Sequence, residues 1–526
     1  MSRWILVSTW TLVSAVALNF TLSGAGSTAI EKAPERVVMG LKVRVNTLNP
    51  FAIESLETFQ VLSHVLEPLA TVDPKNEELR PWLAESWELR PKEKAFRVRI
   101  RKDVEFHNGM RMTAEDVKFS LEAFSNPKYK AVLWQGLYSE VASVRILDPH
   151  QLEFKLHSWR YQPFVSVMTS LRILPRAFYS GRNFETFRTQ LVGTGPFLAT
   201  GFQAGRSFEL KPNSKWWNRT AGLPSFHLVI KPVTDLAMAE QLLNKGDLDF
   251  FRVSSSERRS HQLGVGPKFK VIPTDTGLGE GFSIVLNLKK PLFQSRTLRE
   301  ALLRLWDRDA LDKKLFDGEF ELAVDMISPR LPYYPKGEPI APDAEKAKHL
   351  LLAEGWSDRD QDSVLEKRLE GRTQKLEFEV IVRGREQERW MTLYQSDAAR
   401  VGVRVGLRRM GVEASFWSLA REGKFEAYAN DGGLAAGFFR IVSHSQGAYN
   451  LAGIKSPEMD RLLDELEREF DSKRRADLQS QLVLIERKNI YSLPGLYSRR
   501  EHIWVSSRLL VDPANVERAW SWRLKD

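Results

Sequence analysis

The chain has 526 residues, a formal net charge of +10 and no cysteine. Its length exceeds one ordinary core and predicts several domains, and its hydrophobic content of 43% excludes an intrinsically disordered chain. The missing cysteine excludes structural disulfides and cysteine-based metal sites. Positive and negative residues are spread without a long block of like charge, which argues against a nucleic-acid partner.

The first predicted element is a secretory signal. Arg3 is the only charged residue among the first 30 residues, and a mostly apolar run over residues 4–17 precedes several small residues. This order is typical of a signal peptide, with cleavage expected after Ala25 or Ala29. The alternative is an uncleaved membrane anchor, because the apolar run is nearly long enough to span a bilayer. We expect residues 1–29 to be removed and the mature chain to lie in the periplasm.

Strands and helices are then predicted in alternation. Period-two or continuous apolar residues predict strands, and apolar residues three and four apart predict helices. Strands are expected over residues 37–45, 95–100, 225–233, 247–251, 281–293 and 375–382. Helices are expected over residues 55–69, 113–124, 235–245, 296–316, 386–402 and 456–470. This alternation places the chain in the α/β class.

Local signals mark where some of these elements begin. Thr113 and Asp116 have the spacing of a capping box. Ser456, followed by Pro457, is typical of a helix start. Asn108-Gly109 predicts a hairpin-like turn.

Glycine-rich stretches raise the question of a phosphate-binding loop. A dinucleotide loop requires G-x-G-x-x-G between a strand and a helix. Gly193-Thr194-Gly195 is followed by Pro-Phe-Leu, and the sequence GLGEGF, residues 277–282, precedes a strand. The chain also lacks the motifs G-x-S-x-G, H-E-x-x-H and G-x-x-x-x-G-K-[ST]. The sequence therefore predicts no nucleotide cofactor and no catalytic constellation, which favours a binding protein over an enzyme.

Metal-ligand patterns are incomplete. The nine histidines are scattered, and no pair has the spacing of a helical metal motif. Asp358, Asp360 and Asp362 begin like a calcium loop, but Ser363 and Leu369 stand where that loop requires glycine and glutamate. We interpret the three aspartates as a solvated acidic turn and expect no metal.

Several phrases, in order, resemble solute-binding protein family 5, the extracytoplasmic peptide receptors of ABC importers. They include NTLNPF, LRPWLAESWEL, FRVRIRKDVEFHNGMRMTAEDVKFSLEAF, LLNKGDLDF and EKAKHLLLAEGW. The resemblance covers residues 37 to about 505. Further phrases, such as ILPRAFYSGRNF and YNLAGIKSPEMDRLLDEL, are similar to the branch that takes up microcin-C-type peptides and other oligopeptides.

The resemblance implies a two-lobed α/β periplasmic binding protein of three domains, with a hinge between the lobes. After the signal over residues 1–29, domain I would comprise residues 30–55, 191–274 and 500–526; domain II would be inserted over residues 56–190, and domain III would span residues 275–499. Crossing strands near residues 275 and 500 would form the hinge. The sequence GTGPF would be the turn that returns the chain from domain II, with glycines that permit a tight reversal.

The implied function is capture of a peptide or oligopeptide and delivery to an inner-membrane permease and ATPase complex, by a protein that is expected to be a monomer. Two alternatives stay open. The same fold serves other solutes, such as a metal chelate, an opine or a sugar, and a secreted hydrolase with an unusual site is a different class.

The resemblance also implies candidate ligand-binding residues. An aspartate after a strand in domain III would hold the ligand amine, and Asp431, between Asn430 and Gly432, is the candidate. The alternative is that Asp431 caps a turn, for which Asp-Gly is well suited. Arg383 and Arg440 are candidates for a ligand carboxylate, which arginine binds in bidentate fashion. The remaining candidates are cleft-facing polar groups and stacking surfaces: Asn46, Tyr449, Asn450, Trp134 and Trp417.

Overall fold

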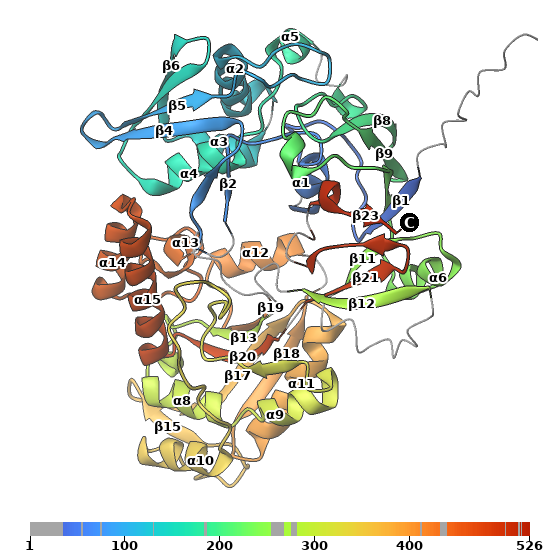
Figure 1. The fold of residues 1–526 in the computed structure, drawn as a ribbon. Coiled ribbons are helices and arrows are strands. Elements are labelled where there is room, and N and C mark those ends of the chain that lie inside the picture. Colours follow the sequence, from blue (N-terminus) through green and yellow to red (C-terminus); the bar gives the residue numbers. More distant parts are fainter. Residues whose placement is uncertain are drawn as a thin grey trace, which may run out of the picture.

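The protein has two lobes, as a computed structural model shows (Figure 1). The structure describes residues 35–53, 56–73, 76–129, 131–182, 187–253, 268–274, 281–410, 413–431, 439–499, 501–513, 516 and 518–525. The first lobe contains the described residues before 275 and after 500, and the second lobe contains those in between. The predicted signal lies outside the described residues. Among the described residues, no helix combines the length and the apolar character needed to span a membrane.

A seven-stranded mixed sheet forms the base of the first lobe. Its strand order is β12-β21-β11-β1-β10-β9-β8. These strands are β1 (Arg36–Leu41), β8 (Phe197–Gln203), β9 (Ser207–Pro212), β10 (His227–Pro232), β11 (Phe250–Val253), β12 (Phe269–Thr274) and β21 (Glu501–Ser506). Helix α6 (Leu236–Lys245) packs on one face. Near the carboxyl terminus, β22 (Leu509–Leu510) pairs with β23 (Arg523–Leu524).

The rest of the first lobe surrounds an antiparallel sheet of order β4-β5-β7-β6. These strands are β4 (Ala84–Arg90), β5 (Ala95–Ile100), β6 (Val141–Asp148) and β7 (Gln151–Leu156). A short hairpin, β2 (Ala70–Val72) and β3 (Leu79–Pro81), precedes them. The helices are α1 (Leu56–Leu62), α2 (Ala114–Ser125), α3 (Val132–Tyr138), α4 (Tyr161–Ser170) and α5 (Arg176–Tyr179). One continuous hydrophobic core joins both sheets.

The second lobe is built on a six-stranded sheet of order β14-β20-β13-β19-β17-β18. These strands are β13 (Gly281–Leu286), β14 (Phe320–Leu322), β17 (Glu377–Val382), β18 (Arg404–Arg409), β19 (Ala427–Asp431) and β20 (Ser492–Ser498). A separate hairpin comprises β15 (Glu366–Leu369) and β16 (Arg372–Lys375). The helices are α8 (Arg296–Arg304), α9 (Arg308–Leu311), α10 (Ala344–Ala353), α11 (Arg385–Ala399), α12 (Glu413–Arg421), α13 (Phe439–Ser443), α14 (Pro457–Arg468) and α15 (Ser472–Asn489).

The local start signals in the sequence are confirmed. Thr113 and Asp116 form the predicted capping box of α2. The Ser456 side chain accepts a hydrogen bond from the Met459 N–H, and Pro457 occupies the first position of α14. These signals succeed because a cap involves only residues within one helical turn.

Several predicted elements are shorter than expected, and for three of them the structure shows the reason. The strand expected over 37–45 ends at Leu41, where its partner β10 reaches Pro232, which has no N–H for the ladder. The helix expected over 55–69 ends at Leu62 because the following backbone pairs with the GTGPF segment. The helix expected over 296–316 breaks after Arg304, because Asp307 caps a new helix by accepting from the Ala310 N–H.

The GTGPF turn lies where the chain re-enters the seven-stranded sheet. The Gly195 N–H donates to the Val65 carbonyl oxygen at 3.0 Å. A Cβ atom on Gly193 would lie 2.1 Å from that same oxygen. Neither glycine has φ in the left-handed region, so the expected reason for glycine is wrong. Close approach of two backbones requires glycine here, rather than a tight reversal.

Two buried ionisable groups flank this turn. The His107 ring contacts both glycines, with Nε2 2.9 Å from the Gly195 oxygen and Nδ1 accepting from the Gly193 N–H at 3.4 Å. The Glu67 carboxylate accepts hydrogen bonds from three indole N–H groups, those of Trp82, Trp216 and Trp217, at 2.9, 3.1 and 3.0 Å. Burial lowers the pKa of His107 to about 4 and raises the pKa of Glu67 to about 7.

Candidate functional site

The carboxyl ends of parallel strands from both lobes lie next to the segments that cross between the lobes. In the first lobe, β1 runs parallel to β10 and β11, and Val253 at the end of β11 pairs with His502. In the second lobe, β17 runs parallel to β18 and β19, and Asp431 at the end of β19 pairs with Phe282. Open α/β sheets bind ligands outside the carboxyl ends of their strands. The candidate site is therefore the region between these two sets of strand ends, which we call the candidate cleft.

An ion pair stands at the strand ends of the second lobe. Arg383 directly follows β17 and Asp431 ends β19, and the Arg383 Nη2 atom lies 2.6 Å from the Asp431 Oδ1 atom. The guanidinium also lies 5.0 Å from the centroid of the Phe416 ring on α12. Asp431 remains 55% exposed, whereas Arg383 is 19% exposed. The structure thus holds a half-exposed carboxylate in place with an arginine that is itself positioned by an aromatic ring.

Asn430 lies next to this pair but faces a neighbouring strand. Its Nδ2 atom donates to the Ser283 Oγ atom on β13 at 3.3 Å. The backbone N–H of Arg383 donates to the Gln387 Oε1 atom at 2.7 Å, which ties the end of β17 to the first turn of α11. Both bonds restrain the backbone around the ion pair. Preorganised groups of this kind bind a ligand at a lower entropic cost.

The first lobe presents a cavity of about 200 Å³ at the ends of β1 and β11. Apolar side chains such as Phe250 and Trp522 line it, together with Lys42, Arg252 and His64. Burial lowers the pKa of His64 to about 4, so its imidazole is neutral near pH 7. Lys42 directly follows β1, and Arg252 is the second-last residue of β11.

Sequence reasoning missed Lys42 and Arg252. Lys42 comes immediately after β1, with its Nζ atom 6.0 Å from the centroid of the Phe251 ring. Arg252 lies within β11, with Nη1 3.7 Å from the Glu501 Oε2 atom on the neighbouring strand. The available signal was a cation at the carboxyl end of a buried strand. Such a cation can be assigned to the candidate site only when it is known that its strand ends at the cleft.

Asn46 does not join the Arg383–Asp431 pair. It is exposed, beyond the end of β1, next to the turn between β8 and β9. In that turn the Gly205 N–H donates to the Val45 oxygen at 2.8 Å. Strands β8 and β9 lie at the opposite end of the sheet from β12 and β21. Asn46 thus lies beyond the carboxyl end of β1, but it is near β8 and β9 and away from the strands next to the lobe crossings.

Arg440 and Asn450 have partners within the second lobe. The Arg440 Nη1 atom lies 2.5 Å from the Asp464 Oδ1 atom. The Asn450 amide donates to the His444 and Ile454 oxygens at 3.0 and 2.7 Å, and its Oδ1 accepts from the Ile454 N–H. Asn450 therefore fixes its own loop.

The remaining candidates are placed less specifically. Tyr449 is 45% exposed in the loop after α13. Trp134 belongs to α3 and Trp417 to α12. Helix α12 lies on the side of the second lobe that faces the first lobe (Figure 1). Gly432 lies outside the described residues. All of these residues stay predictions.

Arg440 also lines a cavity of about 530 Å³ between the lobes. Lys94, Ser158 and Arg160 of the first lobe line it from one side, and Asp464 with Arg440 from the other. Arg160 is held within its own lobe, with Nη2 3.2 Å from the Glu140 Oε2 atom. The cavity shows that the two lobes enclose space away from the strand ends as well.

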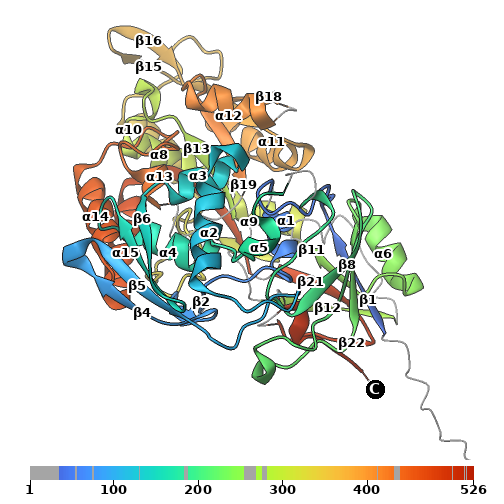
Figure 2. The same cartoon turned by 90° about the horizontal axis from the view of Figure 1, so that it is seen from above.

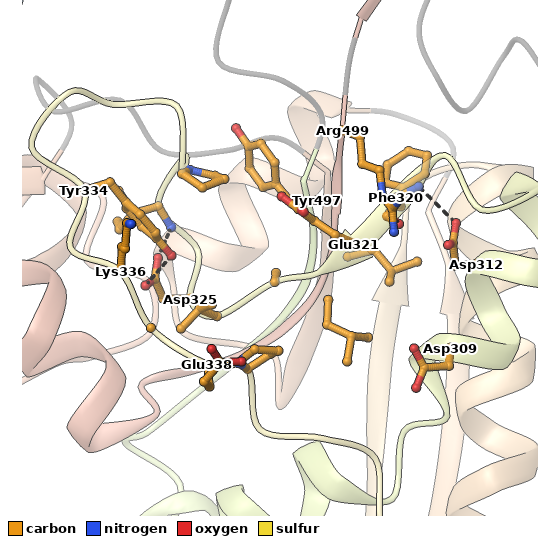
Figure 3. Close-up of a pocket in the computed structure, with 18 residues that line it drawn as sticks. Asp309, Asp312, Phe320, Glu321, Asp325, Tyr334, Lys336, Glu338, Tyr497 and Arg499 are labelled. Atoms are coloured by element: carbon orange, nitrogen blue, oxygen red, sulfur yellow. Dashed lines mark hydrogen bonds between the residues drawn. The ribbon is translucent and has the colours of Figure 1, made fainter.

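A cavity of about 560 Å³ lies within the second lobe, between β14, β20 and the segment that follows β14 (Figure 3). Acidic side chains outnumber basic ones in its lining: they are Asp309, Asp312, Glu321, Asp325 and Glu338. The buried Asp325 already pairs with Arg487 at 2.7 Å and accepts from the Tyr334 hydroxyl at 2.9 Å. All of the residues that line this cavity belong to the second lobe.

The acidic turn predicted from Asp358, Asp360 and Asp362 is exposed. The Lys375 Nζ atom lies 2.8 Å from Asp360 and 2.6 Å from Asp362. Two of the three carboxylates are thus paired with Lys375, which lies on β16. In the part of the chain that the structure describes, this is the one group of carboxylates, histidines or cysteines close enough to hold a metal ion.

Comparisons with known proteins agree with this architecture. The sequence profile of the bacterial extracellular solute-binding proteins, family 5 (middle), matches residues 78–441. The oligopeptide-binding protein AppA of Bacillus subtilis is 27% identical over 283 residues, which cover 52% of this chain and 51% of AppA. The nickel-binding periplasmic protein of Escherichia coli is 25% identical over 415 residues, which cover 75% of this chain and 74% of that protein.

Solved structures extend the likeness over nearly the whole chain. AppA from Bacillus subtilis, in complex with a nonapeptide, has a TM-score of 0.71 at 22% identity and covers 94% of this chain and 100% of its own. NikA from Brucella suis, in complex with Fe(III)-EDTA, has a TM-score of 0.78 at 20% identity, with 93% and 100% covered. The two-lobed binding-protein fold is thereby confirmed, whereas the resemblance to the microcin-C-type branch stays a prediction.

Proposed function

The chain belongs to the bacterial extracellular solute-binding proteins of family 5, and on that premise we propose that it captures a peptide and delivers it to an ABC importer. The partners would be an inner-membrane permease and its ATPase, and the receptor would act as a monomer. Relatives of this chain are named as binding proteins, which favours binding without catalysis.

The observation that carries the peptide assignment is the Arg383–Asp431 pair at the cleft edge of the second lobe. A free peptide has an ammonium group at one end and a carboxylate at the other. The half-exposed Asp431 carboxylate is suited to the ammonium group. Lys42 and Arg252 line the first-lobe cavity and are suited to the carboxylate. A cleft with both signs of charge on fixed elements fits a zwitterionic ligand.

We further propose that the lobes close around the ligand by a hinge. The chain passes from the first to the second lobe between β12 and β13 and returns between β20 and β21. Two crossings allow rotation without repacking either core. The division into domains I, II and III, with the boundaries given above, accompanies this proposal. The mature protein would reside in the periplasm after loss of residues 1–29.

A metal chelate is the second candidate ligand. One relative is named for nickel and one structural neighbour holds Fe(III)-EDTA. In this chain, His64 lines the first-lobe cavity, and its lowered pKa keeps the imidazole in the neutral form that binds metals. An opine or a sugar lacks a comparable observation in its favour, and so does a hydrolytic reaction.

Native mass spectrometry of the purified protein, followed by denaturation and metal analysis, tests these candidates. A retained mass that fragments as a peptide supports the proposal. A retained metal with a small organic chelator overturns it in favour of the second candidate. If neither is retained, titration calorimetry with a peptide library decides, and the absence of any binding overturns the peptide assignment. Conversion of library peptides to smaller products would indicate a hydrolase.

A further inference from the structure

The lobes meet at a second place, remote from the crossing strands. Helices α14 and α15 of the second lobe lie next to α4 of the first lobe. In both views these helices are on the opposite side of the molecule from β12 and β21 (Figures 1 and 2). The cleft is thus bridged on one side by covalent strands and on the other side by side-chain contacts.

Phe470 is at the centre of this contact. Its ring stacks on the Trp159 ring, with centroids 4.3 Å apart and planes inclined by 12°. It also meets Tyr161 edge-on at 5.5 Å and Phe164 at 5.7 Å. All three partners belong to the first lobe, and Phe470 packs against the hydrophobic core of that lobe.

The position of Phe470 differs from that of the other apolar residues in its segment. Met459, Leu462, Leu463 and Leu466 form the buried stripe of α14 and belong to a core of the second lobe. Phe470 follows this stripe with helical spacing, but it lies beyond the end of α14 and packs into the other lobe. The second lobe thus packs one partly buried aromatic side chain against the core of the first.

Arg475 adds a second contact of the same kind. Its guanidinium carbon lies 3.5 Å from the centroid of the Tyr161 ring. Its Nη1 atom donates to the Leu466 and Glu469 carbonyl oxygens at 2.7 and 3.0 Å, so the end of α14 positions the cation. A cation and the aromatic face that it covers attract each other, and the attraction is stronger when water is excluded. Nearby, the Ser472 hydroxyl donates to the Glu78 carboxylate at 3.4 Å.

We propose that Trp159, Tyr161, Phe164, Phe470 and Arg475 form an interlobe latch that holds the two lobes closed in the absence of ligand. The latch is far from the hinge, so a small rotation of the lobes separates its rings. Offset and edge-on ring pairs are favourable only at close range. The latch therefore has two discrete states, engaged and separated, and the engaged state favours the closed arrangement.

The latch uses none of the charged residues at the strand ends. Its contribution to closure therefore exists before a ligand arrives. Because a ligand that bridges both lobes binds the closed form, the apparent affinity is proportional to the closed fraction. The latch thus sets affinity from outside the ligand site. This inference does not depend on which solute the protein binds.

The absence of cysteine makes a distance measurement straightforward. Glu88→Cys on β4 and Glu458→Cys on α14 place one spin label on an exposed position of each lobe. Double electron–electron resonance is then recorded on the full mature chain, which native mass spectrometry has shown to be free of ligand. We expect one dominant short distance in this background. Adding Phe470→Ala should lower the ratio of closed to open molecules about tenfold and add a longer distance.

Two further variants make the result decisive. Tyr161→Ala removes the other side of the latch and should produce the same longer distance. Leu484→Ala is the matched control, because Leu484 lies on α15, is 49% exposed and belongs to no interlobe ring pair among the described residues. Circular dichroism verifies that each variant is folded. An unchanged distance in both Phe470→Ala and Tyr161→Ala overturns the latch, and so does a ligand-free background protein that is already open.

Discussion

The Nη2 atom of Arg383 lies 2.6 Å from the Oδ1 atom of Asp431, although 48 residues separate them in the chain. The parallel pairing of β17 and β19 brings the two strand ends together. Because Asp431 is half-exposed, water screens the pair and it contributes about 0–1 kcal/mol to stability. Its importance is in the fixed position of a carboxylate at the edge of the cleft.

Asp431→Asn is expected to weaken peptide binding without destabilising the fold. A neutral amide cannot form the charge-assisted hydrogen bond to an ammonium group, which is worth about 1.5–3 kcal/mol. Titration calorimetry with a peptide recovered from the purified protein measures the change. Glu377→Gln is a matched control. Glu377 begins β17, the strand that Arg383 follows, and its Oε2 atom lies 3.2 Å from the Arg404 Nη1 atom. Equal affinities for wild type and Asp431→Asn would remove Asp431 from the site.

Gly193→Ala is expected to destabilise the protein by more than about 3 kcal/mol, the range of severe steric substitutions. The new Cβ would lie 2.1 Å from the Val65 carbonyl oxygen, which is backbone and cannot swing away. Urea unfolding measures the loss. Gly136→Ala in α3 is the control, because nothing lies within 4 Å of its Cβ position, and it should stabilise by about 0.5–1 kcal/mol. Similar unfolding midpoints for the two variants would contradict the close-approach explanation.

His107 is expected to make the fold sensitive to acid. Its Nδ1 atom accepts from the Gly193 N–H, so the neutral ring carries its proton on Nε2 and donates to Gly195. Burial lowers the folded-state pKa to about 4, below the ordinary value of 6.5. The unfolded chain thus binds the proton first, and stability present above pH 6.5 is lost as the pH falls through 4.

His107→Gln removes this titration. As the pH falls from 7.5 to 4, the free energy of unfolding should decrease less for the variant than for wild type. The difference between the two decreases should be at most about 3 kcal/mol. His64 titrates in both proteins with a similarly lowered pKa, so it cancels in the comparison. Parallel pH profiles would show that His107 does not carry the effect.

Glu67 is expected to act with the opposite sign. Burial raises its folded-state pKa to about 7 from 4.5, although three indole N–H donors favour the ionised form. The folded state therefore binds the proton first, and this contribution is fully present below pH 4.5 and lost as the pH rises through 7. In wild type, this titration should lower the free energy of unfolding by at most about 3 kcal/mol between pH 4.5 and 8, and Glu67→Gln should abolish that decrease. Urea unfolding at several pH values measures it. A variant that loses stability over this range as wild type does would contradict the raised pKa.

The sequence by itself determined much of the local structure. Thr113 with Asp116 and Ser456 with Pro457 start helices as predicted, because a cap needs only its own first turn. The GTGPF segment leads into strand β8, as the sequence predicted, and not into the helix that a dinucleotide loop requires. The order of family-typical phrases also indicated the two-lobed fold, which the structural neighbours confirm.

Tertiary structure alone decided what these local elements do. The glycines of GTGPF are required by the approach of the Val65 carbonyl, a contact between segments more than 120 residues apart in the chain. The partner strand at Pro232 decided where β1 ends. Phe470 ends the helix that the sequence predicts over residues 456–470, but it lies beyond α14 and its ring stacks on Trp159 of the other lobe. The periodicity of a sequence shows which side of a helix or strand is apolar. It does not show which hydrophobic core that side packs against, because this depends on residues that are distant in the sequence.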